Sequence, residues 1–360
     1  MPIIRQARGL AALSMLVALA ACAGDGTGPR SATFDATRAQ ADVEAVQAAF
    51  AAPAVRSFAA MGARFGADGG FSASVAGTRL LGGVAAVTAG GDHRELTRAA
   101  IAIAGATLRS AASIPAAARG KTFVYDASAQ QYVVSARAGA PADGARFILY
   151  AIDPLTQAPV MASEVGYADV IDLAPSGPLS VGLRLVVVGS GTTYLDYTIA
   201  GTATSLSAAT IAVAGFVTDG TTRVNFSVTA TAAVVAQQTA VKVAFSYTVP
   251  SRSLTVTGAA QEVVSGATAA SQIELTIQSG GSTVRYVFVG TGDTLDVTVS
   301  VNGSLFAHIT GTFEAPTITG AGGHTLTAGE TAALGKLLAL ASDAFAFLDH
   351  LFAPVGAIGI

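Results

Sequence analysis

The chain has 360 residues, of which 51% are hydrophobic and only 12% are charged. Its formal net charge is −3 and its 20 Lys and Arg residues form no basic block, which argues against nucleic-acid binding, since that needs clustered positive charge. The single cysteine excludes an intrachain disulfide, and beyond the N-terminal segment no apolar run reaches the ~20 residues of a membrane-spanning helix.

The N-terminus has the order of an export signal. Arg5 and Arg8 precede an apolar segment, residues 9–21, which ends in small residues. Leu19-Ala20-Ala21-Cys22 closes this segment and resembles the lipobox of bacterial lipoproteins. The resemblance implies that residues 1–21 are a signal peptide cut off before Cys22, and that the Cys22 thiol is acylated. Membrane lipid would then be the partner of the chain through this one residue.

The residues after Cys22 fit a lipid-anchored body. Residues 22–33 are small, polar and Gly- and Pro-bearing, which predicts a flexible tether. Loss of Arg5 and Arg8 with the signal leaves 20 − 2 = 18 basic and 23 acidic residues, a net charge of −5. Ala23, rather than Asp, follows Cys22. By resemblance to the enterobacterial sorting rule, this favours the outer membrane, facing the periplasm or the cell surface.

Residues 34–118 form an Ala- and Gly-rich region for which we expect helices. Asp35 is an N-cap residue type, and Pro53 separates two short amphipathic segments. The apolar stripes are Val43, Val46 and Phe50 in the first segment and Phe58, Met61 and Phe65 in the second. Each stripe predicts packing of the helix against the body.

The stretch 67–118 allows either helix or strand, apart from an expected helix at residues 95–113. Asp92-His93-Arg94-Glu95 is the densest group of charges in the chain. His93 could serve as a base or a ligand with a neighbouring carboxylate. A solvated turn at a helix start is the favoured interpretation, because no second group at ligand spacing accompanies it.

Residues 119–323 change to a period of two, which predicts half-buried antiparallel strands. Apolar residues such as Val224, Phe226 and Val228 alternate with hydroxyl-bearing and other polar residues. The strongest hairpin turns are Asp219-Gly220, Gly280-Gly281 and Asn302-Gly303. The segments beginning at Gly191 and Gly220 share the form G-T-T-x-apolar-D/N-aromatic-T/S-apolar, which predicts a repeated hairpin in a meander.

Residues 324–360 carry a closing helix. Thr327 and Glu330 have the spacing of a capping box, and the segment to residue 352 is apolar on most sides. We therefore predict an α+β, mainly β fold in one domain. A large curved antiparallel meander of about ten to twelve strands would have the N-terminal helices and the C-terminal helix on its concave apolar face.

The sequence contains no nucleophile elbow, zinc-protease, Walker A or EF-hand motif, so we expect neither an enzyme nor a cofactor or metal. Gly290-Thr291-Gly292-Asp293 lacks the following helix of a dinucleotide site. Asp293 and Asp296 are interpreted as surface residues, and His350 as a residue near a helix end.

Three functions stay open at this stage. The first is a lipid-anchored protein that binds a hydrophobic or amphipathic ligand, since the expected fold resembles in outline half-barrel proteins that shuttle lipids or lipoproteins across the periplasm. The second is a structural or protein-interaction module with a fully packed core. The third is an outer-membrane β-barrel, which the sparse aromatics argue against. The body otherwise resembles uncharacterised lipoproteins, which implies no activity.

Overall fold

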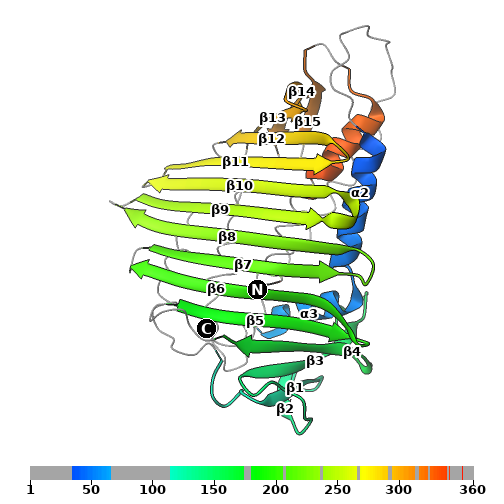
Figure 1. The fold of residues 1–360 in the computed structure, drawn as a ribbon, viewed down its shortest axis with the longest axis vertical. Helices are drawn as coiled ribbons and strands as arrows, with labels where there is room; N and C mark the ends of the chain where they lie inside the picture. Colours follow the sequence, from blue (N-terminus) through cyan, green and yellow to red (C-terminus); the bar gives the residue numbers. More distant parts are fainter. Residues whose placement is uncertain are drawn as a thin grey trace.

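The computed structural model describes residues 35–65, 114–173, 180–205, 208–235, 238–265, 268–290, 294–312, 316–322, 325–338, 340 and 351. The described strands form one open, curved sheet of fifteen, in the order β15 to β3 followed by β1 and β2 (Figure 1). The strands are β1 (Lys121–Asp126), β2 (Gln131–Ser135), β3 (Gly144–Ile152), β4 (Pro159–Asp172), β5 (Ser180–Gly189), β6 (Thr192–Ser205), β7 (Ala208–Thr218), β8 (Arg223–Val235), β9 (Gln238–Val249), β10 (Leu254–Ser265), β11 (Thr268–Ser279), β12 (Ser282–Gly290), β13 (Thr294–Val301), β14 (Ser304–Thr312) and β15 (Pro316–Gly320).

The mainly β meander is confirmed, and two details differ from the prediction. The sheet has fifteen strands instead of about ten to twelve, because small residues obscure the alternation in strands such as β7, which reads AATIAVAGFVT. The pair β1–β3 is parallel, whereas every other pair is antiparallel. The β1–β2 hairpin achieves this by placing β1, not β2, beside β3.

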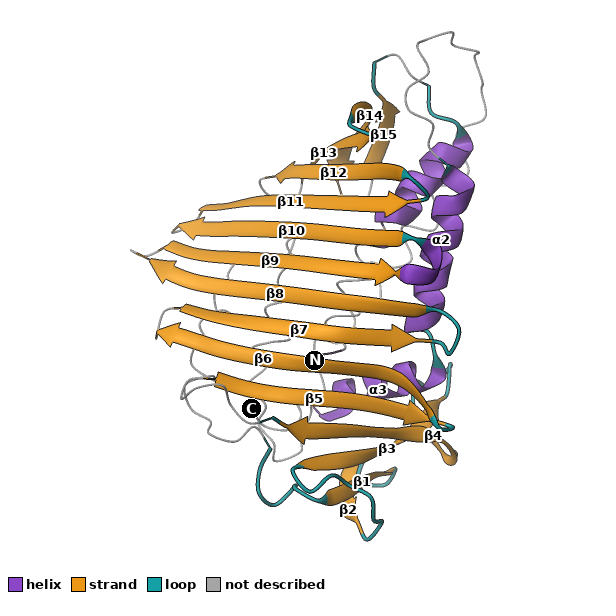
Figure 2. Ribbon diagram, viewed as in Figure 1, coloured by secondary structure: helices purple, strands orange, loops and turns teal. Residues whose placement is uncertain are grey.

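Two N-terminal helices cross the apolar face of the sheet, as predicted (Figure 2). Helix α2 (Ala36–Phe50) begins where the Asp35 carboxylate accepts a hydrogen bond of 2.9 Å from the backbone N–H of Arg38. Helix α3 (Pro53–Phe65) begins at Pro53, which cannot continue the first helix. The stripes of both helices enter one continuous core, in which Val43, Val46, Phe58 and Met61 are buried and Phe50 is half-buried.

The closing helix is confirmed over the described part of the C-terminus, where residues 328–338, 340 and 351 are helical. The capping box is formed: Thr327 Oγ1 accepts from the Glu330 N–H at 3.2 Å, and the Glu330 carboxylate accepts from the Thr327 N–H at 2.8 Å. Lys336 ties this helix to α2 through an ion pair of 2.9 Å with Glu44. Leu334, Leu337, Leu340 and Leu351 are all buried in the same core as the sheet.

The turns at one end of the sheet are short and fixed by their residue types. Gly280-Gly281 and Asn302-Gly303 are two-residue turns with positive φ at both positions, as predicted for type I′ hairpins. Ser190-Gly191 makes the same turn between β5 and β6. A four-residue loop at 219–222 and a 3₁₀ turn, η3 (Pro250–Arg252), complete the neighbouring connections.

The internal repeat places equivalent residues opposite one another across an intervening strand. The repeat aligns Tyr197 with Phe226, and both face Gly215 on the intervening strand β7. The two rings meet across that glycine with centroids 6.1 Å apart. A Cβ at Gly215 would overlap the backbone of Asp196 and Tyr197, so position 215 requires glycine.

Candidate interaction surfaces

The C-terminal helical segment covers the apolar face of the sheet and is held there by hydrogen bonds as well as by packing. The Tyr197 hydroxyl donates to the Leu351 carbonyl at 2.6 Å, and the Tyr286 hydroxyl donates to the Leu334 carbonyl at 3.1 Å. Both tyrosines are 0% exposed. Burial raises the pKa of each phenol above its ordinary value, so each stays a protonated donor at physiological pH. The C-terminal helical segment is therefore fixed in place over the sheet at two points.

Replacing Tyr286 by phenylalanine tests this attachment. The ring stays, but the buried hydrogen bond from the hydroxyl to the Leu334 carbonyl is lost, so we expect about 0.5–1.5 kcal/mol of lost stability. Amide exchange in residues 328–338 should rise more than exchange in β9 and β10. Equal exchange in both regions would show that the hydroxyl does not hold the helix.

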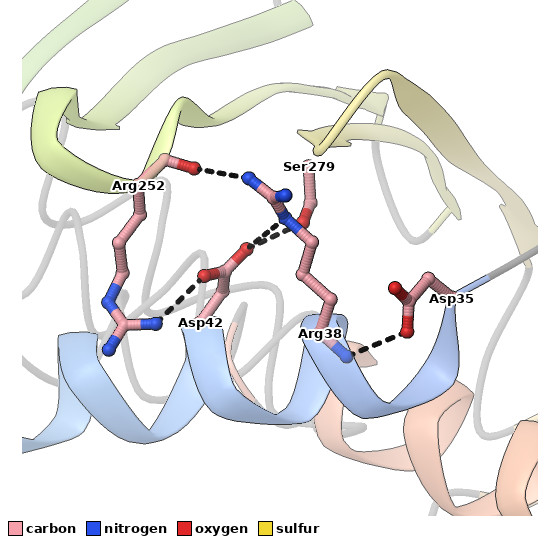
Figure 3. Close-up of polar contacts among 5 residues, drawn as sticks. All are labelled: Asp35, Arg38, Asp42, Arg252 and Ser279. Carbon is pink, nitrogen blue, oxygen red and sulfur yellow. Dashed lines mark hydrogen bonds and ion pairs between the residues drawn. The ribbon is translucent and has the colours of Figure 1, made fainter.

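A buried carboxylate joins helix α2 to two turns of the sheet (Figure 3). Asp42 is 2% exposed and accepts from Ser279 Oγ at 2.5 Å and from Arg252 Nη1 at 3.2 Å. Arg38 Nε lies 4.0 Å from the same carboxylate, and Arg38 Nη2 donates to the Arg252 carbonyl at 3.0 Å. The carboxylate is thus paired and hydrogen-bonded, as a buried charge must be. All of its partners belong to this chain, so the contacts are structural. We call Asp42 with Ser279, Arg252 and Arg38 the Asp42 clamp.

The opposite face of the sheet carries a row of small, mostly hydroxyl-bearing side chains across six strands. Cross-strand pairing aligns Thr198, Ala214, Ser227, Ser246, Thr257 and Thr276 from β6 to β11. The register continues to Arg184 on β5 and Arg285 on β12. At ~4.8 Å between strands, the small residues span about 24 Å. We call this row the outer row; its side chains are uncharged and exposed or half-buried.

Ion pairs bound the outer row at both ends. Arg184 and Arg285 contact Asp196 and Glu274 at 2.8 Å and 2.7 Å. Each arginine makes two parallel hydrogen bonds to its carboxylate. The hydrogen bonds and charge of Arg285 lower the pKa of Glu274 from its ordinary value of 4.5, against the opposing effect of burial. These two pairs neutralise the charges that flank the outer row.

The Glu274–Arg285 pair gives a test by pH. Because the pKa of Glu274 is lowered by folding, the pair stabilises the protein above pH about 5 and loses that contribution as pH falls through the lowered pKa. Both side chains are partly exposed, so Glu274→Gln should cost under about 1 kcal/mol at pH 7. Urea titrations should show a smaller cost at pH 3.5. A cost that is the same at both pH values would rule out the pair as its source.

The structure places only part of the predicted site residues. Cys22 with Leu19, Ala20 and Ala21, the 92–95 cluster, the expected helix at 95–113, Asp293 and His350 lie outside the described residues. Asp296 is described, lies exposed on β13 and pairs with Thr310. In the described ranges, no three His, Cys, Asp or Glu side chains cluster as metal ligands would. The Asp42 clamp was missed, since its members lie 210 and 237 residues from Asp42 in the chain.

These surfaces define a class: an open, curved, mainly antiparallel sheet with one face covered by helices and the other hydroxyl-rich. No helix within the described ranges has both the length and the hydropathy to cross a membrane. Comparison with known proteins adds no name to this class, because no family model, curated protein or solved structure matches the chain.

Proposed function

We propose that this is a lipid-anchored protein of the bacterial cell envelope with no catalytic activity. Its signal peptide is residues 1–21, its anchor is acylated Cys22, and its body is a structural or interaction module. The outer membrane, facing the periplasm or the cell surface, is the proposed location. Support comes from Leu19-Ala20-Ala21-Cys22 after an apolar segment and from the absence of any other cysteine.

One observation favours a packed module over a ligand carrier. The described apolar face is occupied by the chain itself: Tyr197, Tyr247 and Tyr286 are nearly or fully buried, and leucines of the C-terminal helix lie against the sheet. A ligand in the position of that helix would have to break the bonds to Leu334 and Leu351. Of the two faces of the described sheet, the accessible one is therefore the face that carries the outer row.

The mass of the intact protein tests this proposal against the carrier. The full-length gene is expressed with its signal, and the protein is purified from membranes and measured by native mass spectrometry before and after lipid extraction. We expect residues 22–360 with covalent acyl groups and no other lipid. A further lipid bound in stoichiometric amount, lost on extraction, would reject the packed module and support a bound hydrophobic ligand.

A second variant separates a specific ligand from retained membrane lipid. Leu337→Phe enlarges a buried side chain of the C-terminal helix, whereas Ser227→Thr changes the outer row. If a lipid were held beneath the helix, Leu337→Phe should reduce its amount and Ser227→Thr should not. Equal amounts in both variants would assign the lipid to the membrane extract.

A further inference from the structure

One end of the sheet carries both the start of the described chain and its short turns. We define the turn end by residues 153–158, 190–191, 219–222, 250–253, 280–281 and 302–303, which connect the strands there. Helix α2 starts at this end, since Arg38 donates to the Arg252 carbonyl and Asp42 accepts from Ser279. Figure 1 shows α2 along the same end as the β3–β4 hairpin. The described chain therefore begins, at Asp35, at the turn end.

The turn end also carries most of the exposed large apolar side chains. Of the five such residues in the described ranges, Leu155, Val160, Met161 and Leu305 lie at or beside it, whereas Val134 lies on the edge strand β2. Leu155 is 92% exposed at the tip of the β3–β4 hairpin. Val160 and Met161 are 39% exposed beside it, where residues 161–163 bulge out of the β3–β4 pairing. Leu305 follows the Asn302-Gly303 turn.

The hairpin tip holds Leu155 outward by a rigid network. The Asp153 carboxylate accepts from the N–H groups of Leu155 and Thr156, both at 2.8 Å. The Gln157 N–H donates to the Asp153 carbonyl at 2.8 Å, and the Asp153 N–H donates to the Ala158 carbonyl at 2.9 Å. The N–H groups of Thr156 and Leu155 that bond to the carboxylate lower the pKa of Asp153. The loop satisfies much of its own backbone, which reduces the cost of moving it into a less polar medium.

We propose that the turn end lies against the membrane and that the Leu155 tip, with Val160 and Met161, enters the lipid interface. This inference depends on the proposed anchoring at Cys22. The chain from Cys22 to Asp35 reaches about 45 Å at most. The β3–β4 hairpin lies eight strands from the β11–β12 turn, or about 38 Å at ~4.8 Å per strand. A tether of this length therefore allows the turn end, including the β3–β4 hairpin, to lie against the bilayer that holds the anchor.

Lipid is favoured over a protein partner by this geometry. The apolar side chains are spread over the β3–β4 loop, β4 and β14, so an extended surface such as a bilayer contacts them together better than a compact site would. The anchored chain also holds a bilayer at high local concentration beside this end. Insertion of a few apolar side chains would add buried apolar area to the contact that the acyl anchor already makes.

The single cysteine makes a direct test available. The full chain is expressed with Leu155→Cys, purified in acylated form, labelled with an environment-sensitive NBD probe and reconstituted into vesicles of phosphatidylethanolamine and phosphatidylglycerol. Thr257→Cys, on the outer row, is the matched control. We expect a blue-shifted emission at position 155 and loss of that emission when the lipids carry doxyl groups. Position 257 should show neither change.

The other outcomes overturn the inference in distinguishable ways. An acylated protein that floats with vesicles but keeps an aqueous probe at position 155 rejects membrane contact and leaves the anchor standing. A blue shift without doxyl quenching assigns the tip to a protein contact. A chain without acyl groups, seen by mass, rejects both proposals. Met161→Asp in the labelled Leu155→Cys protein should reduce the quenching, and unchanged quenching would exclude an apolar contact there.

Discussion

A Cys22→Ser variant should lose the acylated, signal-cleaved form of the protein from the membrane fraction. Each buried acyl methylene contributes ~0.8 kcal/mol, so removal of the lipid attachment site removes the strongest membrane interaction expected of this chain. We expect the signal to stay uncleaved, and at least a tenfold fall in the share of signal-cleaved protein that floats with membranes. Fractionation of cells on a flotation gradient, with antibody detection, gives the measurement.

The control for this variant is Asp25→Asn, in the predicted tether. It keeps Cys22 and removes one charge, so it should float like the natural chain. A Cys22→Ser protein with a processed N-terminus that still floats after a carbonate wash would mean that another part of the chain holds the membrane. In that case the Leu155 tip alone would be the next candidate.

An Asp42→Ala variant should be the most destabilised single substitution of a polar residue among those discussed. The change leaves Arg252 and Arg38 without their carboxylate and removes the acceptor for Ser279. Breaking a buried pair from one side costs 3–5 kcal/mol in general, and both arginines are partly exposed, so we expect about 2–4 kcal/mol. Urea unfolding measures this loss, and faster amide exchange in α2 would locate it.

Glu44→Ala is the matched control for Asp42 on the same helix. Its ion pair with Lys336 is exposed, so its loss should cost under about 1 kcal/mol. If the two variants lost equal stability, the clamp would contribute no more than a surface pair. Helix α2 would then be held by Val43, Val46 and its other apolar contacts alone.

Much of the fold follows from local patterns in the sequence. The β8 residues Val224, Phe226 and Val228 are buried while Ser227 and Thr229 are exposed, as the alternation predicted. Thr327 and Glu330 form their capping box, and Asn302-Gly303 forms its turn, because both depend on residues close in the chain. These local rules determined the type of each element.

The features that were missed depend on distant contacts. The β1–β2 hairpin joins the sheet through the parallel pair β1–β3, and no local sequence pattern shows which of its two strands will pair with β3. Strand β7 has Ala and Gly where larger residues would show the period, and Gly215 has a role only because Tyr197 and Phe226 meet across it. Asp42 resembles any helix-surface acid until Arg252 and Ser279 are brought to it. The exposure of Leu155 likewise depends on the loop that surrounds it.

The most direct test of the proposed anchoring is the mass of the N-terminal peptide of the mature protein. The protein is purified from its membrane and digested, and the peptide that begins at residue 22 is analysed. We predict that the chain starts at Cys22 and carries a thioether-linked diacylglycerol. A mature protein that starts elsewhere, or that has an unmodified Cys22 thiol, would contradict lipid anchoring.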